Sequence, residues 1–573
     1  MQIVHKFRIP AILCAFAVLL CELIAHPIAN MGICDDGAYI PMAQKLAATG
    51  HVVYNGWAAP LLLWQLYLAA AFIKLFGFSF TTVRMSTILT AMVTAFLLQR
   101  ILVRSTITER NATIATLALV LSPLYLLLSA TFMSDIFGLF AVVICLYGCL
   151  RALQSSTDNS TIAWLCFAVV TNALFGTSRQ NSWLGILVMV PSALWLLRAQ
   201  RRVFIAGAVA TLAGVFFILA CLHWLNHQPY LMPEHLLVHD FKVRPTAIRL
   251  IGAFLDMPLL LLPILALFFP QIRKSKTILI AIFSVLCLGY LLLALYPTSL
   301  SASFPLEPTL GGWVDASGVF SGIARKGDPP AFLHTGIRVL LTIASFTGLL
   351  CFTTTLLDST KKPLQDDRPR SQAPWKVLGV LLAPFTLVYI LLLIPRAGSS
   401  GIYDRYLPTL LVVALLCLVR LYQDRIRPEL GAAGAALVAI MALYGMACTH
   451  NTFALYRARL AIASELHAAG IDDTSVDSGW EYNIGVELQH ANHINNASLI
   501  LPANAYTPTP PPPAGACEMW MYDPVPHIHP LYAVAFNPNV CYGLAAFSPV
   551  HFSRWPFRTP GTLYVVRTLP AKQ

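Results

Sequence analysis

Two adjacent carboxylates, Asp35 and Asp36, follow directly after an apolar segment that ends near Ile28. Carboxylates can accept a proton or hold a cation, and an ionisable group at the rim of an apolar bundle is costly unless water, a partner or a reaction uses it. The simpler alternative is that Asp35 caps the helix that Asp36 begins, although a cap needs only one short polar side chain. The pair is therefore the first candidate site.

A second group of charged and aromatic residues lies where later apolar segments begin or end. Arginine forks bind phosphate through paired N–H donors, and a tyrosine ring can stack on a flat ligand. The candidates are Tyr39, Asp135, Arg179, Arg405 and Tyr406, with Lys242 and Arg244 as weaker phosphate ligands. For the arginines the alternative is that their side chains only extend to the lipid headgroups.

The composition excludes a soluble protein of this size. Of the 573 residues, 57% are hydrophobic and only 11% are charged, and the mean hydropathy is +0.69. One water-soluble core could not bury such a share of apolar residues. The net charge of +12 is explained by basic groups between the apolar segments, so it does not predict a nucleic-acid partner. We expect an α-helical polytopic membrane protein.

Apolar runs long enough to cross a bilayer predict about thirteen transmembrane helices. They lie near residues 9–28, 82–103, 111–131, 136–152, 161–178, 182–198, 203–222, 248–269, 277–297, 335–357, 376–394, 405–423 and 430–448. When these spans alternate, the basic clusters at 100–110, 198–202, 273–276, 361–370 and 425–427 all fall on the side of the amino terminus. The positive-inside rule then predicts a cytoplasmic amino terminus and a retained first helix.

The apolar stretch 58–76 would break this alternation if it were a span. Its aromatic residues and Lys74 are typical of an interfacial helix, so we place it on the outer membrane surface. The transmembrane part then covers residues 1–448, with outer loops at 29–81, 223–247, 298–334 and 395–404. The first loop carries the acid pair, and the loop 298–334 is long enough to close over a substrate as a lid.

An odd number of spans places residues 449–573 on the outer face. Within them, residues 460–470 and 471–476 predict a helix, a glycine stop and a short strand, and hence a small extracytoplasmic α/β domain. Cys517 and Cys541 are able to pair in an oxidising compartment. Four histidines share one outer loop, where they form either a metal site or part of a solvated loop: His223, His227, His235 and His239.

The order of these motifs resembles the C-type glycosyltransferase superfamily, in the branch that holds protein O-mannosyltransferases and aminoarabinose transferases. The resemblance covers most of the membrane part and rests on the order and sidedness of short motifs. These are the acid pair, Tyr39 and a short helix ending at Gly50, the aromatic surface helix, Phe78-Ser79-Phe80 to Arg84, Phe132-Met133-Ser134-Asp135 and Asp404-Arg405-Tyr406-Leu407-Pro408.

The resemblance implies a sugar transfer at the outer membrane surface, from a polyprenyl-phosphate-linked donor to a hydroxyl or amine of a protein, lipid or polysaccharide. Asp35 matches the first acid of the family's Asp-Glu pair, which is taken as the catalytic base. Asp36 stands where the family has Glu, and Asp135 matches the second acid. Trp57-Ala58-Ala59-Pro60 replaces the family's His/Lys-Pro-Pro stretch, which leaves any metal role of that stretch open.

Displacement of a lipid phosphate from an anomeric carbon requires a base, a stabilised oxocarbenium-like transition state and cations for the departing phosphate. Asp35 is the expected base, and Asp36 or Asp135 would orient the acceptor or hold a cation. Arg179 and Arg405 are the expected phosphate ligands, and Tyr39 would stack on the sugar. A single displacement inverts the anomeric centre. A divalent metal remains open as a cofactor.

Two other classes fit the same span count. A transporter or flippase for a lipid-linked or sugar substrate would show internal repeats and charges near the midplane, whereas these acids gather at one face. An inactive scaffold whose outer domain binds a partner is the other alternative. Transfer from a polyprenyl donor at the outer face is common in bacterial members of the family, so we expect a bacterial inner membrane with the carboxyl-terminal domain in the periplasm.

Overall fold

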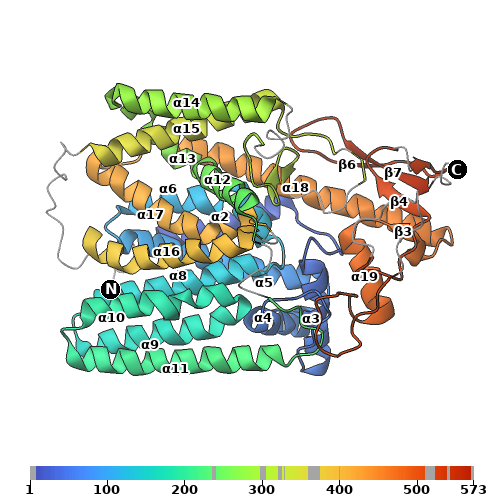
Figure 1. Ribbon diagram of the computed structural model, residues 1–573, viewed down its shortest axis with the longest axis horizontal. Helices are drawn as coiled ribbons and strands as arrows, with labels where there is room; N and C mark the ends of the chain where they lie inside the picture. Colours follow the sequence, from blue (N-terminus) through green and yellow to red (C-terminus); the bar gives the residue numbers. More distant parts are fainter. Residues whose placement is uncertain are drawn as a thin grey trace.

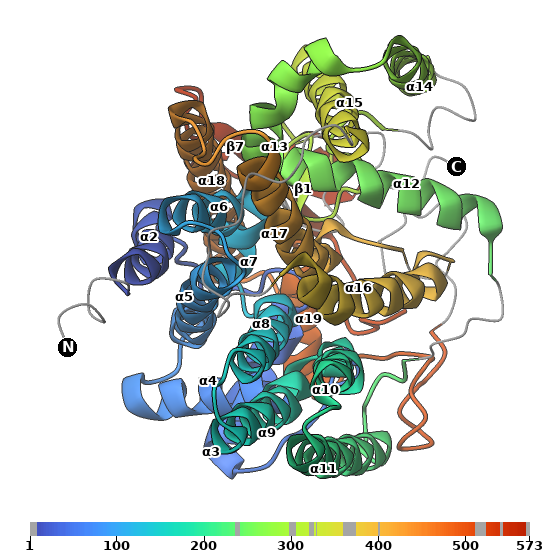
Figure 2. The ribbon, with the colours of Figure 1, turned by 90° about the vertical axis from the view of Figure 1, so that its left-hand side faces the viewer.

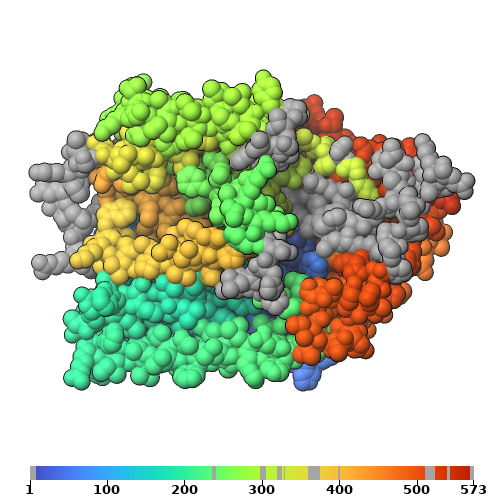
Figure 3. Space-filling model, in the orientation of Figure 1, coloured from blue at the N-terminus to red at the C-terminus, as the bar shows by residue number. Residues whose placement is uncertain are grey.

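The protein is a long bundle of helices with a small α/β domain at one end (Figure 1). The computed structural model describes residues 8–234, 241–296, 305–319, 326–327, 329–358, 374–398, 401–509, 523–538 and 542–568. The bundle helices run along the long axis, so most are seen end-on when the molecule is turned by 90° (Figure 2). Figure 3 shows the carboxyl-terminal residues covering one end of the bundle, against part of the amino-terminal segment.

Each of the predicted spans coincides with a helix or a bent pair of helices. The unbroken ones are α2 (Ile9–Ala25), α5 (Phe80–Arg104), α8 (Ser134–Leu153), α9 (Asp158–Phe175), α11 (Arg201–Asn226), α14 (Thr277–Leu295), α15 (Thr335–Leu357), α16 (Trp375–Gly398), α17 (Pro408–Arg425) and α18 (Ala432–Ala468). The span near 182–198 combines η2 (Gln180–Trp183), the π-helical η3 (Gly185–Met189) and α10 (Val190–Leu197), and follows η1 (Gly176–Ser178).

By length and composition, nine helices of the described chain can cross a membrane, or eleven if each of two bent pairs counts as one span. One pair is α6 (Glu109–Val120) with α7 (Pro123–Ser129), bent by 68°. The other joins α12 (Val243–Leu260) to α13 (Leu262–Leu265) and η4 (Ala266–Lys274), bent by 64°. The short α2 and the more polar α17 account for the difference from the expected thirteen. The predicted polytopic helical class is confirmed.

The bend between α6 and α7 has a local cause. Proline has no backbone N–H and cannot continue a helix from the preceding turn, and Pro123 starts α7. The Ser122 hydroxyl accepts a hydrogen bond from the Tyr125 backbone and so caps the new helix. Because of this bend, the chain after α7 passes beside the loop that carries the acid pair.

Two short helices lie across the ends of the bundle helices (Figures 1 and 2). They are α3 (Asp36–Thr49), which ends at Gly50 with φ of 76°, and the apolar α4 (Leu63–Phe76). The helix α4 corresponds to the stretch 58–76 that the sequence places on the surface. Together they cover the end of the bundle at which the candidate site lies.

The carboxyl-terminal domain contains a five-stranded sheet and one helix, α19 (Trp480–Ala491). The strands are β3 (Val476–Asp477), β4 (Tyr532–Ala535), β5 (Tyr542–Leu544), β6 (Val550–Phe552) and β7 (Gly561–Thr568). Their order is β3-β4-β7-β5, with β6 also on β7; only β3 and β4 run parallel. Ala533 of β4 faces Val566 of β7 in the register.

The expected helix and glycine stop are present, since α18 ends at Ala468 and Gly470 has φ of 79°. The strand expected at 471–476 is wrong in its bounds, because residues 473–475 form the 3-10 helix η7 (Asp473–Ser475) and β3 covers only Val476–Asp477. The expected boundary at 448/449 falls inside α18, which runs from the bundle into the domain without a break. Cys517, Cys541, His235 and His239 lie outside the described residues, so neither the disulfide nor the four-histidine cluster is described. In the outer loop 298–334, a two-stranded ribbon pairs β1 (Val314–Asp315) with β2 (Gly318–Val319).

Candidate active site

Asp35 lies in the turn between α2 and α3, at the end of the bundle that carries the carboxyl-terminal domain (Figure 1). It stands at the N-cap position of α3, but its side chain makes no capping hydrogen bond. Its Oδ1 accepts a hydrogen bond from the Trp57 indole at 2.9 Å, and its Oδ2 accepts one from Arg405 at 2.9 Å. The geometry therefore favours a site role for Asp35 over the capping alternative.

The environment of Asp35 keeps it ionised. Burial raises the pKa of this carboxyl, but the adjacent Arg405 guanidinium and the hydrogen bonds from Trp57 and Arg405 outweigh burial, so the pKa lies below its ordinary value. The same pair holds the pKa of Arg405 well above its ordinary value despite burial. The side chains are 13% and 14% exposed, so this ion pair is at the edge of the protein interior.

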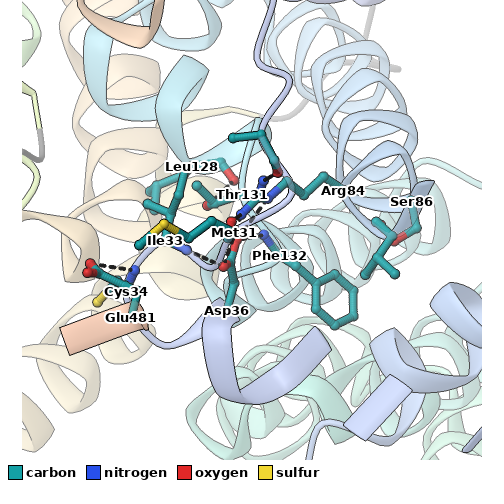
Figure 4. Close-up of polar contacts among 12 residues, drawn as sticks. Met31, Ile33, Cys34, Asp36, Arg84, Ser86, Leu128, Thr131, Phe132 and Glu481 are labelled. Atoms are coloured by element: carbon teal, nitrogen blue, oxygen red, sulfur yellow. Dashed lines mark hydrogen bonds and ion pairs between the residues drawn. The ribbon is translucent and has the colours of Figure 1, made fainter. Parts of the chain in front are cut away.

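Asp36 is fully buried, and its side chain faces Arg84 and the backbone of Phe132 (Figure 4). Its Oδ2 accepts hydrogen bonds from Arg84 Nε at 3.0 Å and the Phe132 backbone at 3.1 Å, and its Oδ1 accepts from Arg84 and the Ile33 backbone. Arg84 also donates to the carbonyls of Ala29 and Met31.

Burial raises the pKa of Asp36, with the Arg84 guanidinium acting in the opposite direction. All four groups that contact Asp36 are donors, so its carboxylate form fits this setting. The expected acceptor or cation role for Asp36 does not agree with this geometry, because neither oxygen is open to a ligand. The contacts instead hold residues 33–36, which we call the acidic turn, against α5 and the start of α8.

Asp135 forms the second acid–arginine pair of the site. It lies in the first turn of α8, where the helix dipole favours a carboxylate, and its Oδ1 accepts a hydrogen bond from Arg179. Gly138 makes room for Arg179, because a Cβ there would lie 3.2 Å from the arginine Cδ. Asp135 Oδ2 and Arg405 Nε are among the buried side-chain atoms of the described residues that have no hydrogen-bond partner, so each has a free position for a ligand.

The ring of Tyr406 joins the two pairs. Its centroid lies 4.9 Å from the guanidinium of Arg179, 5.5 Å from that of Arg405 and 5.8 Å from that of Arg396. Arg396 also donates to the Tyr406 hydroxyl at 3.3 Å and to Glu234 at 2.6 Å. Three guanidinium groups therefore surround one aromatic ring, and each of them is paired with a carboxylate. Their N–H donors suit the binding of a phosphate that competes with these carboxylates.

Tyr39 is buried in α3 beside the same groups. Burial raises the pKa of its hydroxyl well above the ordinary value, and the charges of Asp35 and Asp135 raise it further. The structure thus brings together Tyr39, Asp35, Asp135, Arg179, Arg405 and Tyr406. Lys242 and Arg244 are not part of this group; they are exposed at the start of α12.

The part of the outer loop 298–334 that the structure describes is docked on the site. Asp404 accepts hydrogen bonds from the backbones of Trp313 and Val314, and burial raises the pKa of Asp404 well above its ordinary value. Trp313 itself is buried, and a Cβ on Gly312 would lie 3.0 Å from the ring of Tyr403. The turn before the β1–β2 ribbon therefore packs directly on the segment that carries Arg405.

Four residues are not predicted as site residues from the sequence: Trp57, Arg84, Arg396 and Glu481, whose carboxylate accepts a hydrogen bond from the Cys34 backbone. Trp57 and Arg84 occur in motifs of the sequence, but without an assigned role. An arginine such as Arg84, near the start of an apolar span, signals a buried carboxylate partner. Trp57 was interpreted as part of the interfacial belt. Glu481 comes from the carboxyl-terminal domain, and nothing local in the sequence connects it to Asp35. Among the described residues, no group of three or more His, Cys, Asp or Glu could hold a metal ion.

Comparisons with known proteins support the class that these features define. Residues 59–226 match the dolichyl-phosphate-mannose-protein mannosyltransferase family, and the matched segment includes Asp135 and Arg179. The sequence matches no curated protein. The helices define a polytopic membrane protein, and the family match over residues 59–226 supports the glycosyltransferase class for this part of the chain. The resemblance to the C-type glycosyltransferase superfamily is confirmed by this match.

Three solved structures show remote similarity. ArnT from Cupriavidus metallidurans in the apo state is 12% identical, with 96% of this chain and 97% of that chain covered and a TM-score of 0.41. The apo oligosaccharyltransferase of Archaeoglobus fulgidus is 14% identical, with 91% and 69% covered and a TM-score of 0.42. The S. cerevisiae Pmt1-Pmt2 complex bound to the sugar donor is 15% identical, with 38% and 32% covered and a TM-score of 0.31.

Proposed function

We propose that the protein transfers a sugar from a polyprenyl-phosphate-linked donor to an acceptor at the outer face of the membrane. The observation that carries this proposal is the pairing of two carboxylates with two arginines around Tyr406. In a displacement at carbon, a carboxylate can remove the proton of the acceptor, and an arginine can bind the phosphate that leaves.

In the proposed reaction the acceptor oxygen or nitrogen attacks the anomeric carbon while its proton passes to Asp35. The bond between this carbon and the phosphate oxygen breaks, and polyprenyl phosphate leaves with the electron pair. Arg405 and Arg179 bind its developing negative charge through their N–H donors. Asp135 holds Arg179 in place, and one displacement inverts the anomeric configuration.

Arg405 links the removal of the acceptor proton to the binding of the donor phosphate. In the structure it neutralises Asp35, and this holds the pKa of Asp35 below its ordinary value. A carboxylate of such low basicity is a weak base. When the donor phosphate binds, it competes for the Arg405 guanidinium, and Asp35 becomes more basic as its partner is drawn away. Donor binding would therefore activate the base.

We expect the acid limb of the pH profile of kcat/KM to move to higher pH in Arg405→Gln. The base must be ionised, so activity is retained above the pKa of Asp35 and lost as the pH falls through it. Loss of the Arg405 charge removes the main influence that lowers this pKa. Arg405→Lys, which keeps a cation, should show a smaller displacement. Profiles with coincident acid limbs in all three forms would exclude Arg405 as the group that sets the basicity of Asp35.

A transporter remains the second candidate, because the helical bundle alone is compatible with it. Sealed proteoliposomes that contain a labelled lipid-linked sugar and a soluble acceptor outside distinguish the two. We expect label to become covalently attached to the acceptor, and lipid phosphate to appear in equal amount. Label that crosses the bilayer while still attached to its lipid, with no transfer, would establish transport instead.

We further propose a bacterial inner membrane, a cytoplasmic amino terminus and a periplasmic carboxyl-terminal domain. The basic clusters support this orientation, since they favour the cytoplasmic side. The site and the sheet domain lie at the same end of the bundle (Figure 1). An acceptor presented in the periplasm would therefore meet both the reaction centre and the domain.

A further inference from the structure

We infer that α19 of the carboxyl-terminal domain positions Asp35, and that Glu481 is the residue through which it does so. This inference rests on the proposed function, in which Asp35 is the base. It assigns to the domain a direct part in the geometry of the reaction centre, in addition to any part in recognising the acceptor.

The first contact is made by Glu481 in the opening turn of α19. Its Oε1 accepts a hydrogen bond from the backbone N–H of Cys34 at 3.3 Å, and Cys34 immediately precedes Asp35. Cys34 has φ of 56°, a strained conformation for a residue with a side chain, which persists only when the surroundings hold it. Figure 4 shows Glu481 facing this backbone on the side away from Arg84.

The second contact is made by the neighbouring Trp480. Its ring lies 4.5 Å from the ring of Trp57, at 56°, and the indole N–H of Trp57 donates to Asp35 Oδ1. Two consecutive residues of α19 thus reach Asp35 by two routes, one through the backbone and one through a tryptophan. The carboxylate is held by contacts that originate in different parts of the chain.

Glu481 is itself fixed by two buried groups. Its Oε1 accepts a hydrogen bond from the Tyr456 hydroxyl at 2.5 Å, and its Oε2 forms an ion pair with Arg459 at 3.0 Å. Both partners belong to α18, which continues from the bundle into the domain. The Glu481 side chain is fully buried, so it is not a surface charge whose position solvent could change.

The start of α19 is anchored to the sheet as well. Asp477 at the end of β3 accepts hydrogen bonds from the Gly479 backbone and the Asn483 amide, and forms an ion pair with Lys326 at 3.0 Å. Lys326 belongs to the outer loop 298–334. The loop, the sheet and α19 are therefore joined where the helix meets the acidic turn.

The test compares Glu481→Ala with Glu481→Gln in the full-length protein. Glutamine keeps an acceptor oxygen for Cys34 N–H, whereas alanine removes it. Small displacements of a reacting group can cost about 100-fold in rate. We expect Glu481→Ala to lower kcat by about 10- to 100-fold with little change in the KM for the donor, and glutamine to restore most of the loss.

Glu487→Ala is the matched control. Glu487 lies on the same helix and is fully buried, but its partner is His527, which donates from its backbone at 3.1 Å. We expect this variant to lose thermal stability while keeping the wild-type kcat. The positioning role is excluded if Glu481→Ala keeps the wild-type kcat, or if Glu487→Ala lowers kcat by as much as Glu481→Ala does. Either result leaves the proposed transferase activity of the wild-type protein intact.

A second measurement does not depend on turnover. Cys34 is 5% exposed, and release of its backbone should open the turn. We expect maleimide labelling of Cys34, followed by mass spectrometry, to become faster in Glu481→Ala and to stay unchanged in Glu487→Ala. Unchanged labelling in both would show that α19 does not hold the turn. If labelling is faster in Glu481→Ala but the wild-type protein transfers no sugar, the proposed function is overturned. The contact between α19 and the acidic turn would then be structural only.

Discussion

Asp35→Asn is expected to lower kcat for sugar transfer by about 100- to 10,000-fold, the usual contribution of a general base. Asparagine has nearly the same shape and can still accept the hydrogen bond from Trp57, but it cannot take the acceptor's proton or neutralise Arg405. The donor should bind at least as well, because Arg405 is then free for its phosphate. The measurement is single-turnover transfer together with donor binding, both in lipid.

The chain offers a close control for this variant. Asp424 also accepts a hydrogen bond from a tryptophan indole, that of Trp375 at 2.9 Å, and also forms an ion pair with an arginine, Arg420 at 3.5 Å. It lies in the last turn of α17, at the end of the bundle opposite the carboxyl-terminal domain (Figure 1). Asp424→Asn should keep wild-type transfer. Equal losses in both variants would mean that removal of a charge, and not of the base, lowers the rate.

Arg84→Met is expected to lower the free energy of unfolding by about 3–5 kcal/mol, because it leaves the buried Asp36 carboxylate without its cation. Adding Asp36→Asn to this variant should restore part of the loss. The amide is neutral, and its oxygen still accepts from one of the backbone N–H groups of Ile33 and Phe132. Denaturant unfolding in detergent micelles measures both changes.

Arg100→Met on the same helix is the comparison. Arg100 forms an ion pair with Glu109 at 3.5 Å, but the two side chains are 15% and 29% exposed, so solvent screens the pair and its loss should cost about 0–1 kcal/mol. If Arg84→Met costs no more than Arg100→Met, Asp36 does not depend on its arginine and the acidic turn is held by other contacts.

The sequence predicts the membrane helices well because each follows from a local property, a run of apolar residues of sufficient length. It also predicts that Asp35, Asp135, Arg179 and Arg405 share one side, since alternation of the spans decides the side of each loop, and the structure brings these four residues together. The same alternation predicts that the stretch 58–76 is not a span, and α4 is a helix of only 14 residues. These features need no knowledge of long-range contacts.

What the sequence does not predict is how the two adjacent acids differ. Asp35 and Asp36 are neighbours of the same type, yet one pairs with Arg405 at the protein edge and the other with Arg84 in the interior. Their partners lie 370 and 48 residues away, so only the packing of the bundle decides which acid is open. The contact of Glu481 with Cys34 spans 447 residues and is likewise a property of the tertiary fold.

The most direct test of the account is release of polyprenyl phosphate by the purified protein in lipid. A panel of polyprenyl-phosphate sugars would be incubated with and without acceptor hydroxyl or amine compounds, using wild type and Asp35→Asn. We predict that wild type releases lipid phosphate from at least one donor, in equal amount to the glycosylated acceptor, and that Asp35→Asn does not. Release by both forms at the same rate would contradict the role of Asp35, and no release from any donor by folded wild type would contradict the transferase itself.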